Sequence, residues 1–324
     1  MGDVMRFGIL GAAKFAREHM GPAIHAAKGA ELAGLATSDP AKADAFRAFA
    51  PGVQVFTDYD ALLADPSIDA VYIPLPNHLH VPWAVKALEA GKHVLVEKPL
   101  ALRAADFDQV IAARDNSGKL AVEAFMIAHH PQFARARELV QGGAIGTLCH
   151  VDAAFSYNSA GDTTNIRLDP AKGGGGLYDI GVYTFGAARL VTGSEPISVP
   201  YAKLGYENGV DVFAQVAANF PDFTYSAIVS MRMFTRQYIA FHGDKGLLTL
   251  TCPFNANVFG QAELVLENAG FVKTHERWPG QNHYVTQVEN FVNSATTGAP
   301  YPCPLEFSRG TQEMMDMVFA AGDT

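Results

Sequence analysis

The sequence predicts an α/β protein of two domains, a doubly wound parallel sheet followed by an α+β domain. Its 324 residues exceed the usual size of one domain. Over about the first 125 residues, short β-rich runs alternate with amphipathic segments, which is typical of a parallel sheet covered by helices on both faces. Beyond that point the β-rich runs lengthen and short turns join them, which favours an antiparallel or mixed sheet. We therefore place the domains at 1–125 and 126–324.

The first domain is predicted from apolar runs that end at turn residues. The run MRFGIL stops at Gly11, and a helix expected before Gly91 stops at that glycine. Strands are expected at 5–10, 31–36, 53–56, 70–73, 92–96 and 120–123. Helices are expected at 12–27, 40–49, 58–64, 81–90 and 104–117.

The second domain begins with a predicted helix at 131–141. One further helix, at 177–191, interrupts the β-rich runs, and helices at 284–296 and 306–319 close the chain. Strands are expected at 147–157, 199–206, 210–219, 224–233, 237–242 and 246–251.

Composition and charge exclude several classes of protein. The formal net charge is −9, which argues against nucleic acid as a partner because phosphate backbones require a basic surface. Cys149, Cys252 and Cys303 are few and widely spaced, so neither a disulfide framework nor a metal site is expected. No apolar run reaches about 18 residues and no secretory leader is evident, so we expect a cytoplasmic protein without a membrane partner.

The first predicted strand runs into GAAKFA, a candidate phosphate-binding turn. A dinucleotide-binding turn has the pattern G-x-G-x-x-G/A at this place, and alanine here replaces the second and third glycines. An ordinary strand–helix turn is the alternative, but the place at the start of a βαβ unit favours a cofactor. The expected contacts are Gly11, Ala12, Ala13, Lys14 and Phe15.

The end of the second strand bears on the choice between NAD and NADP. NAD sites usually carry an Asp or Glu there, whereas this chain has Thr37 and Ser38. Their hydroxyls would donate to a 2′-phosphate that a carboxylate would repel, with Lys42 or Lys14 supplying positive charge. The sequence therefore favours NADP, with NAD as the alternative.

Two further loops follow predicted strands at the edge where an open α/β sheet binds its ligand. The loop IPLPNHLH is stiffened by prolines, and we expect Leu75, Pro76, Asn77 and His80 to lie along the nicotinamide half of the cofactor. No further metal ligand accompanies its histidines. In the next loop, Glu97 and Lys98 end an apolar strand, and Pro99 fixes where Lys98 points.

Taken together, these segments resemble the Gfo/Idh/MocA oxidoreductase family. The resemblance covers essentially the whole chain, through GILGAAKFA, IPLPNHLH, VEKPLAL, EAFMIAHHPQ and NIRLDPAKGGGGLYDIGVY. It implies a Rossmann domain and a second domain with a large open, mostly antiparallel sheet that serves as a homo-oligomer face. It further implies that Lys98, Asp179 and Tyr183 meet at the nicotinamide. The chain is most similar to an NADP-dependent branch with sugar dehydrogenases, although relatives preferring NADP often carry Ser-Arg at Thr37-Ser38.

Tyr183 is the expected general acid/base. An unperturbed phenol has a pKa of about 10, and a lysine ammonium nearby would favour the phenolate. Lys98 is assigned as the lysine that favours the Tyr183 phenolate. Asp179, one helical turn before Tyr183, would hold Lys98 or a substrate hydroxyl. We expect the glycines 173–176 to let the backbone turn closely beside the cofactor pocket.

The expected substrate is a sugar or a similar polyhydroxylated carbinol or carbonyl compound. Asn165, Arg167, Tyr157 and His283 are candidates for binding it, and Phe125 is a weaker one. His129 and His130 are expected to pack at a helix start. The alternatives are a cofactor-binding sensor without turnover and an NAD-dependent lyase or glycosidase.

Overall fold

A computed structural model describes residues 4–162 and 164–322, which form two compact units. The first contains the chain up to residue 129 together with 283–308, and the second contains 130–282 and the chain from 309 onward. The segment 283–308, expected in the second domain, thus joins the first. The reason is packing: helix α8 (His283–Thr297) contacts α1 and β2, and Phe291 lies 5.5 Å from Phe7, ring centre to ring centre.

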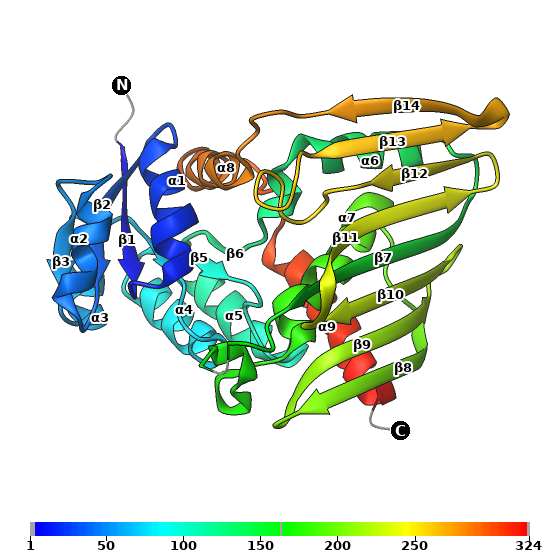
Figure 1. Ribbon diagram of the computed structural model, residues 1–324. Helices are drawn as coiled ribbons and strands as arrows, with labels where there is room; N and C mark the ends of the chain where they lie inside the picture. Colours follow the sequence, from blue (N-terminus) through cyan, green and yellow to red (C-terminus); the bar gives the residue numbers. More distant parts are fainter. Residues whose placement is uncertain (1–3, 163, 323–324) are drawn as a thin grey trace. The chain divides into compact units, whose positions relative to one another are not determined.

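The first unit is built on a six-stranded parallel sheet in the order β3-β2-β1-β4-β5-β6 (Figure 1). This is the strand order of a doubly wound dinucleotide-binding fold, as predicted. The strands are β1 (Met5–Leu10), β2 (Ala30–Ala36), β3 (Gln54–Phe56), β4 (Ala70–Ile73), β5 (His93–Glu97) and β6 (Ala121–Ala124).

Helices cover the sheet and bury its apolar strands. Their bounds are η1 (Ala16–Met20), α1 (Gly21–Ala26), η2 (Pro40–Ala43), α2 (Asp44–Arg47), α3 (Tyr59–Ala64), η3 (Asn77–Leu79), α4 (His80–Glu89), η4 (Ala104–Asp106), α5 (Phe107–Ser117) and η5 (Met126–His129). Val71, Ile73, Val94 and Val96 are buried in a core with side chains of α4 and α5. This burial explains why the strands read as continuous apolar runs.

The second unit is built on an eight-stranded mixed sheet in the order β14-β13-β12-β11-β7-β10-β9-β8 (Figure 1). Among the described strands, β7 and β10 are a parallel pair and the other neighbours are antiparallel. The strands are β7 (Leu148–Asn158), β8 (Ser198–Glu207), β9 (Val210–Asn219), β10 (Thr224–Ser230), β11 (Arg232–Gly243), β12 (Gly246–Leu250), β13 (Glu263–Asn268) and β14 (Val272–Arg277).

Helices lie against one face of this sheet. Helix α7 (Val182–Thr192) contacts β7 and β11, and α6 (Pro131–Gln141) contacts β12 and β13. The other helical segments are η6 (Ile166–Leu168), η7 (Pro170–Lys172), η8 (Leu177–Gly181), η9 (Ala269–Phe271) and α9 (Leu305–Gly322), of which residues 305–308 belong to the first unit. The antiparallel or mixed sheet predicted from the sequence is confirmed.

The strands β13 and β14 are an addition to the predicted sheet. Both are rich in charged side chains, and Glu263 of β13 lies within 3.0 Å of His275 and 2.7 Å of Arg277 on β14. Such cross-strand pairs stabilise an edge while charge discourages further strand pairing. An apolar alternation is therefore absent at β14, which is why periodicity did not reveal it.

No helix within the described part of the chain is both long and apolar enough to cross a membrane.

Candidate active site

The turn after β1 has the backbone conformation that a phosphate-binding turn requires. Gly11 has φ +98°, its N–H donates to the carbonyl of Ala36 at 2.8 Å, and an added Cβ would lie 3.1 Å from Cδ2 of Leu75. Glycine is thus required for both conformation and space. Ala12, Ala13 and Phe15 are half-buried, and Lys14 is exposed with its ammonium 4.0 Å from Glu18.

At the end of β2, Ser38 is exposed to solvent, and Thr37 and Asp39 make hydrogen bonds within the same turn. The hydroxyl of Thr37, which is buried, accepts from the N–H of Asp39 at 3.2 Å and lies 3.3 Å from the carbonyl of Asp39. The carboxylate of Asp39 accepts from the N–H of Ala41 at 3.2 Å and so caps η2. One carboxylate oxygen of Asp39 therefore bonds within its own turn.

His80 connects the two loops that follow β4 and β5. It is fully buried, with Nε2 2.7 Å from the carbonyl of Leu75 and Nδ1 2.8 Å from the carbonyl of Pro99. Desolvation lowers the pKa of His80 to about 4, outweighing the carbonyl contacts that raise it. The neutral ring has one N–H, so it donates to one carbonyl at a time. Leu75 belongs to the core, whereas Pro76 and Asn77 are half-buried.

The loop after β5 is held by two acidic side chains. Glu97 accepts from the hydroxyl of Tyr72 at 2.6 Å and from the N–H of Lys98 at 3.2 Å, and burial raises the pKa of Glu97. Glu123, which is buried, accepts from the N–H of Leu100 at 2.8 Å. The Lys98–Pro99 peptide is cis. The hydrogen bonds to Glu97 and Glu123 hold the backbone on either side of Lys98, which is half-buried.

In the second unit, Asp179 joins two of the predicted substrate-binding residues. Its Oδ1 lies 2.8 Å from Nε of Arg167, and its Oδ2 accepts from the hydroxyl of Tyr157 at 2.7 Å. The Asp179 side chain is 11% exposed, whereas that of Arg167 is 45% exposed. Arg167 therefore pairs with a shielded carboxylate while its own side chain stays partly exposed.

The electrostatics of this cluster follow from the same contacts. Asp179 raises the pKa of Arg167, and the acidic groups of Tyr157 and Tyr183 add to that rise. Burial, followed by the charge of Asp179, raises the pKa of the Tyr157 hydroxyl, so Tyr157 acts as a hydrogen-bond donor. Asn165 orients Arg167 by accepting from its N–H at 3.0 Å and from Nη1 at 3.4 Å.

Tyr183 is buried on α7, in the turn after the π-helical segment η8 that carries Asp179. Its ring packs against Phe155 and Phe254, which stack on each other, at centre-to-centre distances of 5.8 and 6.0 Å. Single π-helical turns occur often at functional sites because they redirect side chains. Here one such turn sets the angle between Asp179 and Tyr183.

The remaining candidates belong to the first unit, as does Lys98. His283 is buried at the start of α8 with its ring 4.4 Å from that of Tyr284. Phe125 is buried against Phe307. The structure therefore groups Asn165, Arg167, Tyr157 and Asp179 within one unit.

A residue that the sequence did not single out lies beneath the Asp179 helix. Asp211, near the start of β9, is buried and accepts from the N–H of Leu177 at 2.7 Å. The signal available in the sequence was a carboxylate at the start of the apolar run VDVFAQVAA. Its partner lies 34 residues away along the chain, which no local pattern reveals.

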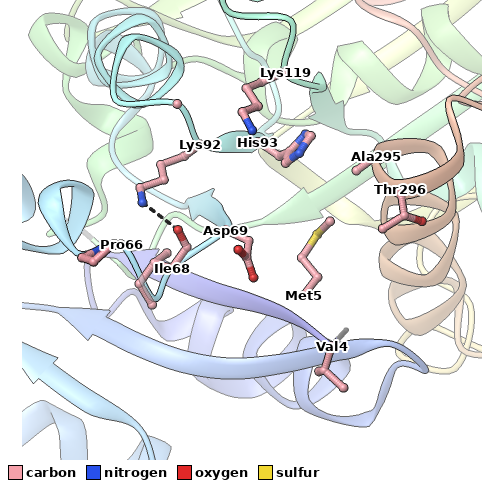
Figure 2. Close-up of a pocket in the computed structure, with 11 residues that line it drawn as sticks. Val4, Met5, Pro66, Ile68, Asp69, Lys92, His93, Lys119, Ala295 and Thr296 are labelled. Atoms are coloured by element: carbon pink, nitrogen blue, oxygen red, sulfur yellow. Dashed lines mark hydrogen bonds between the residues drawn. The ribbon is translucent and has the colours of Figure 1, made fainter. Parts of the chain in front are cut away.

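A cavity of about 340 Å³ in the first unit lies at the opposite edge of the parallel sheet (Figure 2). It is lined at the amino ends of strands, by Met5 of β1 and His93 of β5 and by Asp69 and Lys119 just before β4 and β6. Lys92 beside it donates to the carbonyls of Asp65 and Ile68 at 2.8 and 2.6 Å. Ligands of doubly wound sheets bind at the carboxyl ends, where the predicted loops lie.

Within 4–162 and 164–322 no group of three or more His, Cys, Asp or Glu side chains is arranged to hold a metal ion.

Comparison with known proteins identifies both parts of the chain. Residues 5–125 match the model of an oxidoreductase family with an NAD-binding Rossmann fold, and residues 133–249 match the GFO/IDH/MocA C-terminal domain. An uncharacterized oxidoreductase of Rhizobium meliloti is 38% identical over 98% of this chain and 96% of its own length. An NADP⁺-dependent D-xylose 1-dehydrogenase of Haloferax volcanii is 33% identical over 99% of this chain and 98% of its own length.

A solved structure is similar over the same length. A 3-ketoreductase from Actinomadura kijaniata, crystallised with NADP and TDP-benzene, matches with a TM-score of 0.90 and 28% identity over 98% of each chain.

Proposed function

Because this chain belongs to the Gfo/Idh/MocA family of oxidoreductases, we propose that it transfers a hydride between NADP(H) and a sugar-like carbinol or carbonyl. The named relatives include an NADP⁺-dependent D-xylose dehydrogenase and a ketoreductase crystallised with NADP. The first acts on a sugar by its name, and the second was crystallised with TDP-benzene. We extend that cofactor and that substrate class to this chain.

The observation that carries the proposal is the cluster of Asp179, Arg167 and Tyr157 on the unit that bears Tyr183. A shielded carboxylate and a partly exposed guanidinium offer an acceptor and donors side by side. Polyhydroxylated substrates need such paired partners, because each hydroxyl both donates and accepts. A purely structural ion pair would not require the Tyr157 hydroxyl as a third member.

The residues of the first unit fit a dinucleotide. Gly11 has the positive φ expected of the tight turn that begins a phosphate-binding loop, and Leu75 of the loop after β4 lies close to it. Ser38 is exposed at the end of β2, and the carboxylate of Asp39 is engaged as a helix cap. We propose that Gly11–Phe15 hold the pyrophosphate, that Thr37 and Ser38 lie at the 2′-phosphate, and that Leu75–Asn77 and Glu97–Lys98 border the nicotinamide.

In the proposed mechanism Tyr183 holds and moves the substrate proton. The phenolate accepts the proton of the carbinol hydroxyl during oxidation, and the phenol returns it to the carbonyl oxygen during reduction. NADP(H), when bound, supplies or accepts the hydride. Lys98 lowers the cost of the phenolate by its positive charge, and Arg167 adds to the positive potential around Tyr183. Asp179 and Tyr157 orient the substrate hydroxyls.

A turnover assay tests the proposal directly. Purified protein is mixed with NADPH or NADP⁺ and a panel of free aldoses, including xylose, and nucleotide-linked keto sugars, and NADPH absorbance is followed. We expect turnover with at least one member of the panel and a preference for NADP(H) over NAD(H). Cofactor binding without turnover on any member would instead favour a sensor.

We also propose that the open face of the mixed sheet binds a second copy of the chain. The face away from α6 and α7 carries a polar network in which His150 lies 2.7 Å from Thr224 and 3.0 Å from Ser226, and Tyr238 donates to Asp152. Light scattering should give a dimer or a larger homo-oligomer. Ile228→Arg, on that face, should lower the mass, and a monomeric wild type would contradict the proposal.

A further inference from the structure

The inference concerns Asp211 and the glycine run before the Asp179 helix. Asp211 is 2% exposed, and its Oδ2 accepts from the N–H of Leu177, the first residue of η8, at 2.7 Å. The N–H of Gly176 also donates to this carboxylate. Amides of the first helical turn have no partner within the helix, so a buried carboxylate at this place both satisfies them and complements the helix dipole.

The glycines are shaped around that carboxylate. An added Cβ on Gly175 would lie 2.2 Å from Oδ1 of Asp211, and one on Gly176 would lie 3.3 Å from Oδ2. Gly175 also has φ +133°, which side chains other than hydrogen rarely allow. The glycine run therefore leaves room for the Asp211 side chain at the start of the helix.

The same glycines connect the helix to Arg167. The N–H of Gly175 donates to the carbonyl of Arg167 at 2.9 Å, and a Cβ on Gly174 would lie 2.4 Å from that oxygen. The N–H of Asp179 donates to the carbonyl of Gly175 at 3.1 Å. One short backbone segment thus fixes Arg167, Asp179 and the helix start relative to Asp211.

We propose that Asp211 is a positioning residue that sets Asp179 and Tyr183 by holding the start of their helix through Leu177 and Gly176. The inference rests on the proposed function, in which Tyr183 moves the substrate proton. Asp211 acts through the backbone of η8 and not by contact with substrate. A displacement of about 1 Å in a catalytic group is enough to cost a large factor in rate, so a cap at this place has a direct effect on turnover.

The buried charge of Asp211 has a cost to the stability of the fold. Burial raises the pKa of Asp211 to about 6, and Asp179 also raises it, while the N–H donors lower it. A buried carboxylate that ionises at neutral pH destabilises the fold relative to a neutral isostere. The N–H donors of Leu177 and Gly176 offset part of that cost, which fits a carboxylate that holds the start of the helix.

The test compares Asp211→Asn with Glu207→Gln. Asparagine at this position keeps one oxygen that accepts from the N–H of Leu177. It replaces the other oxygen with an NH₂ group, which cannot accept from a second N–H donor. Glu207 lies at the end of the neighbouring strand β8, where it pairs with Arg232 at 2.7 Å. We expect Asp211→Asn to lower kcat at least about tenfold, with NADPH affinity within about twofold and an unfolding temperature at neutral pH no lower than that of the wild type. Glu207→Gln should leave all three values unchanged.

Hydrogen exchange of the segment 176–184 provides a readout that needs no substrate. Faster exchange in Asp211→Asn, together with the fall in kcat, supports the proposal. Unchanged exchange would show that Asp211 does not hold the helix, and faster exchange with unchanged kcat would reduce its role to structure; either overturns the proposal. If the wild type turns over no substrate, the proposed function fails and the exchange result alone decides whether Asp211 holds the helix.

Gly175→Ala provides a second route should Asp211→Asn fold poorly. Its methyl group must displace the Asp211 carboxylate, so we expect the same loss of kcat and the same rise in exchange. Normal turnover in folded Gly175→Ala would overturn the proposal.

Discussion

The hydroxyl of Tyr157 donates a 2.7 Å hydrogen bond to Oδ2 of Asp179, whose other oxygen lies 2.8 Å from Nε of Arg167. Both carboxylate oxygens are therefore engaged from within one unit. Asp179 therefore holds Arg167 and Tyr157 together, and the proposed mechanism also gives it contact with the substrate.

The first prediction follows from the loss of that donor. Tyr157→Phe should lower kcat/KM about tenfold, because a hydrogen bond to a charged group contributes about 1.5–3 kcal/mol and Arg167 still holds the carboxylate. Steady-state kinetics in the preferred direction measure the effect. Tyr201→Phe, an exposed tyrosine of β8, serves as the control. Equal kinetics for the two variants would remove Tyr157 from the site.

The second prediction concerns the proposed acid/base. Tyr183→Phe keeps a ring packed against Phe155 and Phe254 but removes the ionisable hydroxyl. We expect kcat to fall at least about a hundredfold with NADPH affinity almost unchanged. Binding is followed by NADPH fluorescence and turnover by absorbance. A Tyr183→Phe enzyme with wild-type kcat would show that another group moves the proton.

As part of the second prediction, Lys98 is tested in the same way, with Lys98→Met and Lys98→Arg as a matched pair. Methionine removes the charge on a side chain of similar length, and arginine retains it. We expect a loss of kcat of at least about a hundredfold for methionine and a smaller loss for arginine. If both variants lose equally, geometry and not charge is the property that matters.

The first unit was predictable from the sequence because its signals are local. Each parallel strand is a short apolar run that ends at a turn, and Gly11 sits where the first strand must turn. The strands of the described Rossmann sheet accordingly lie within one or two residues of their predicted bounds. The family resemblance that those motifs indicated is confirmed by the matching family models.

The parts that the sequence did not reveal depend on partners distant along the chain. Helix α8 was expected in the second domain but packs with α1 of the first unit, through side chains such as Phe291 and Phe7. The glycines before Asp179 were expected to lie beside a cofactor. In the structure Gly175 and Gly176 accommodate the carboxylate of Asp211, which is distant in sequence. Periodicity and motif spacing contain no information on such pairs.

The third prediction concerns His80, which lies between the carbonyls of Leu75 and Pro99. His80→Leu should lower the free energy of unfolding by about 2 kcal/mol, because buried carbonyls lose their donor. It should also weaken NADPH binding, since both loops border the proposed nicotinamide site. Denaturant titration and NADPH fluorescence measure the two effects. His78→Ala, its exposed neighbour, should change neither, and equal behaviour of the two variants would contradict the assignment.

The fourth prediction is a pH dependence of stability from Asp211. Its pKa is raised from 3.8 to about 6, so the folded protein binds a proton more tightly than the unfolded chain. This contribution to stability is complete below about pH 4 and is lost as the pH rises to about 6. The difference of about two pKa units corresponds to about 3 kcal/mol.

Asp211→Asn isolates this effect from other titrations. Burial lowers the pKa of His80 to about 4, so its contribution has the opposite sign and is lost as the pH falls below about 6.5. Wild type and Asp211→Asn share that histidine, so their difference reports Asp211. Relative to wild type, the variant should gain stability as the pH rises from 4 to 6. A constant difference between the two denaturation curves would show that Asp211 ionises normally.

The fifth prediction concerns cofactor choice at Ser38. Ser38 is exposed directly after β2, the neighbour of β1 in the sheet, and the adjacent Asp39 carboxylate caps η2. An arginine at this place would present a planar guanidinium to a 2′-phosphate, where a bidentate pair is stronger than a hydroxyl contact. Ser38→Arg should therefore lower the Kd for NADPH about tenfold and leave that for NADH unchanged, and added salt should reduce the gain. Ser38→Glu should raise the Kd for NADPH, because its carboxylate repels the same phosphate. If both substitutions leave the NADPH-to-NADH ratio at its wild-type value, the 2′-phosphate does not bind beside Ser38, and Lys14 or Lys42 becomes the position to test.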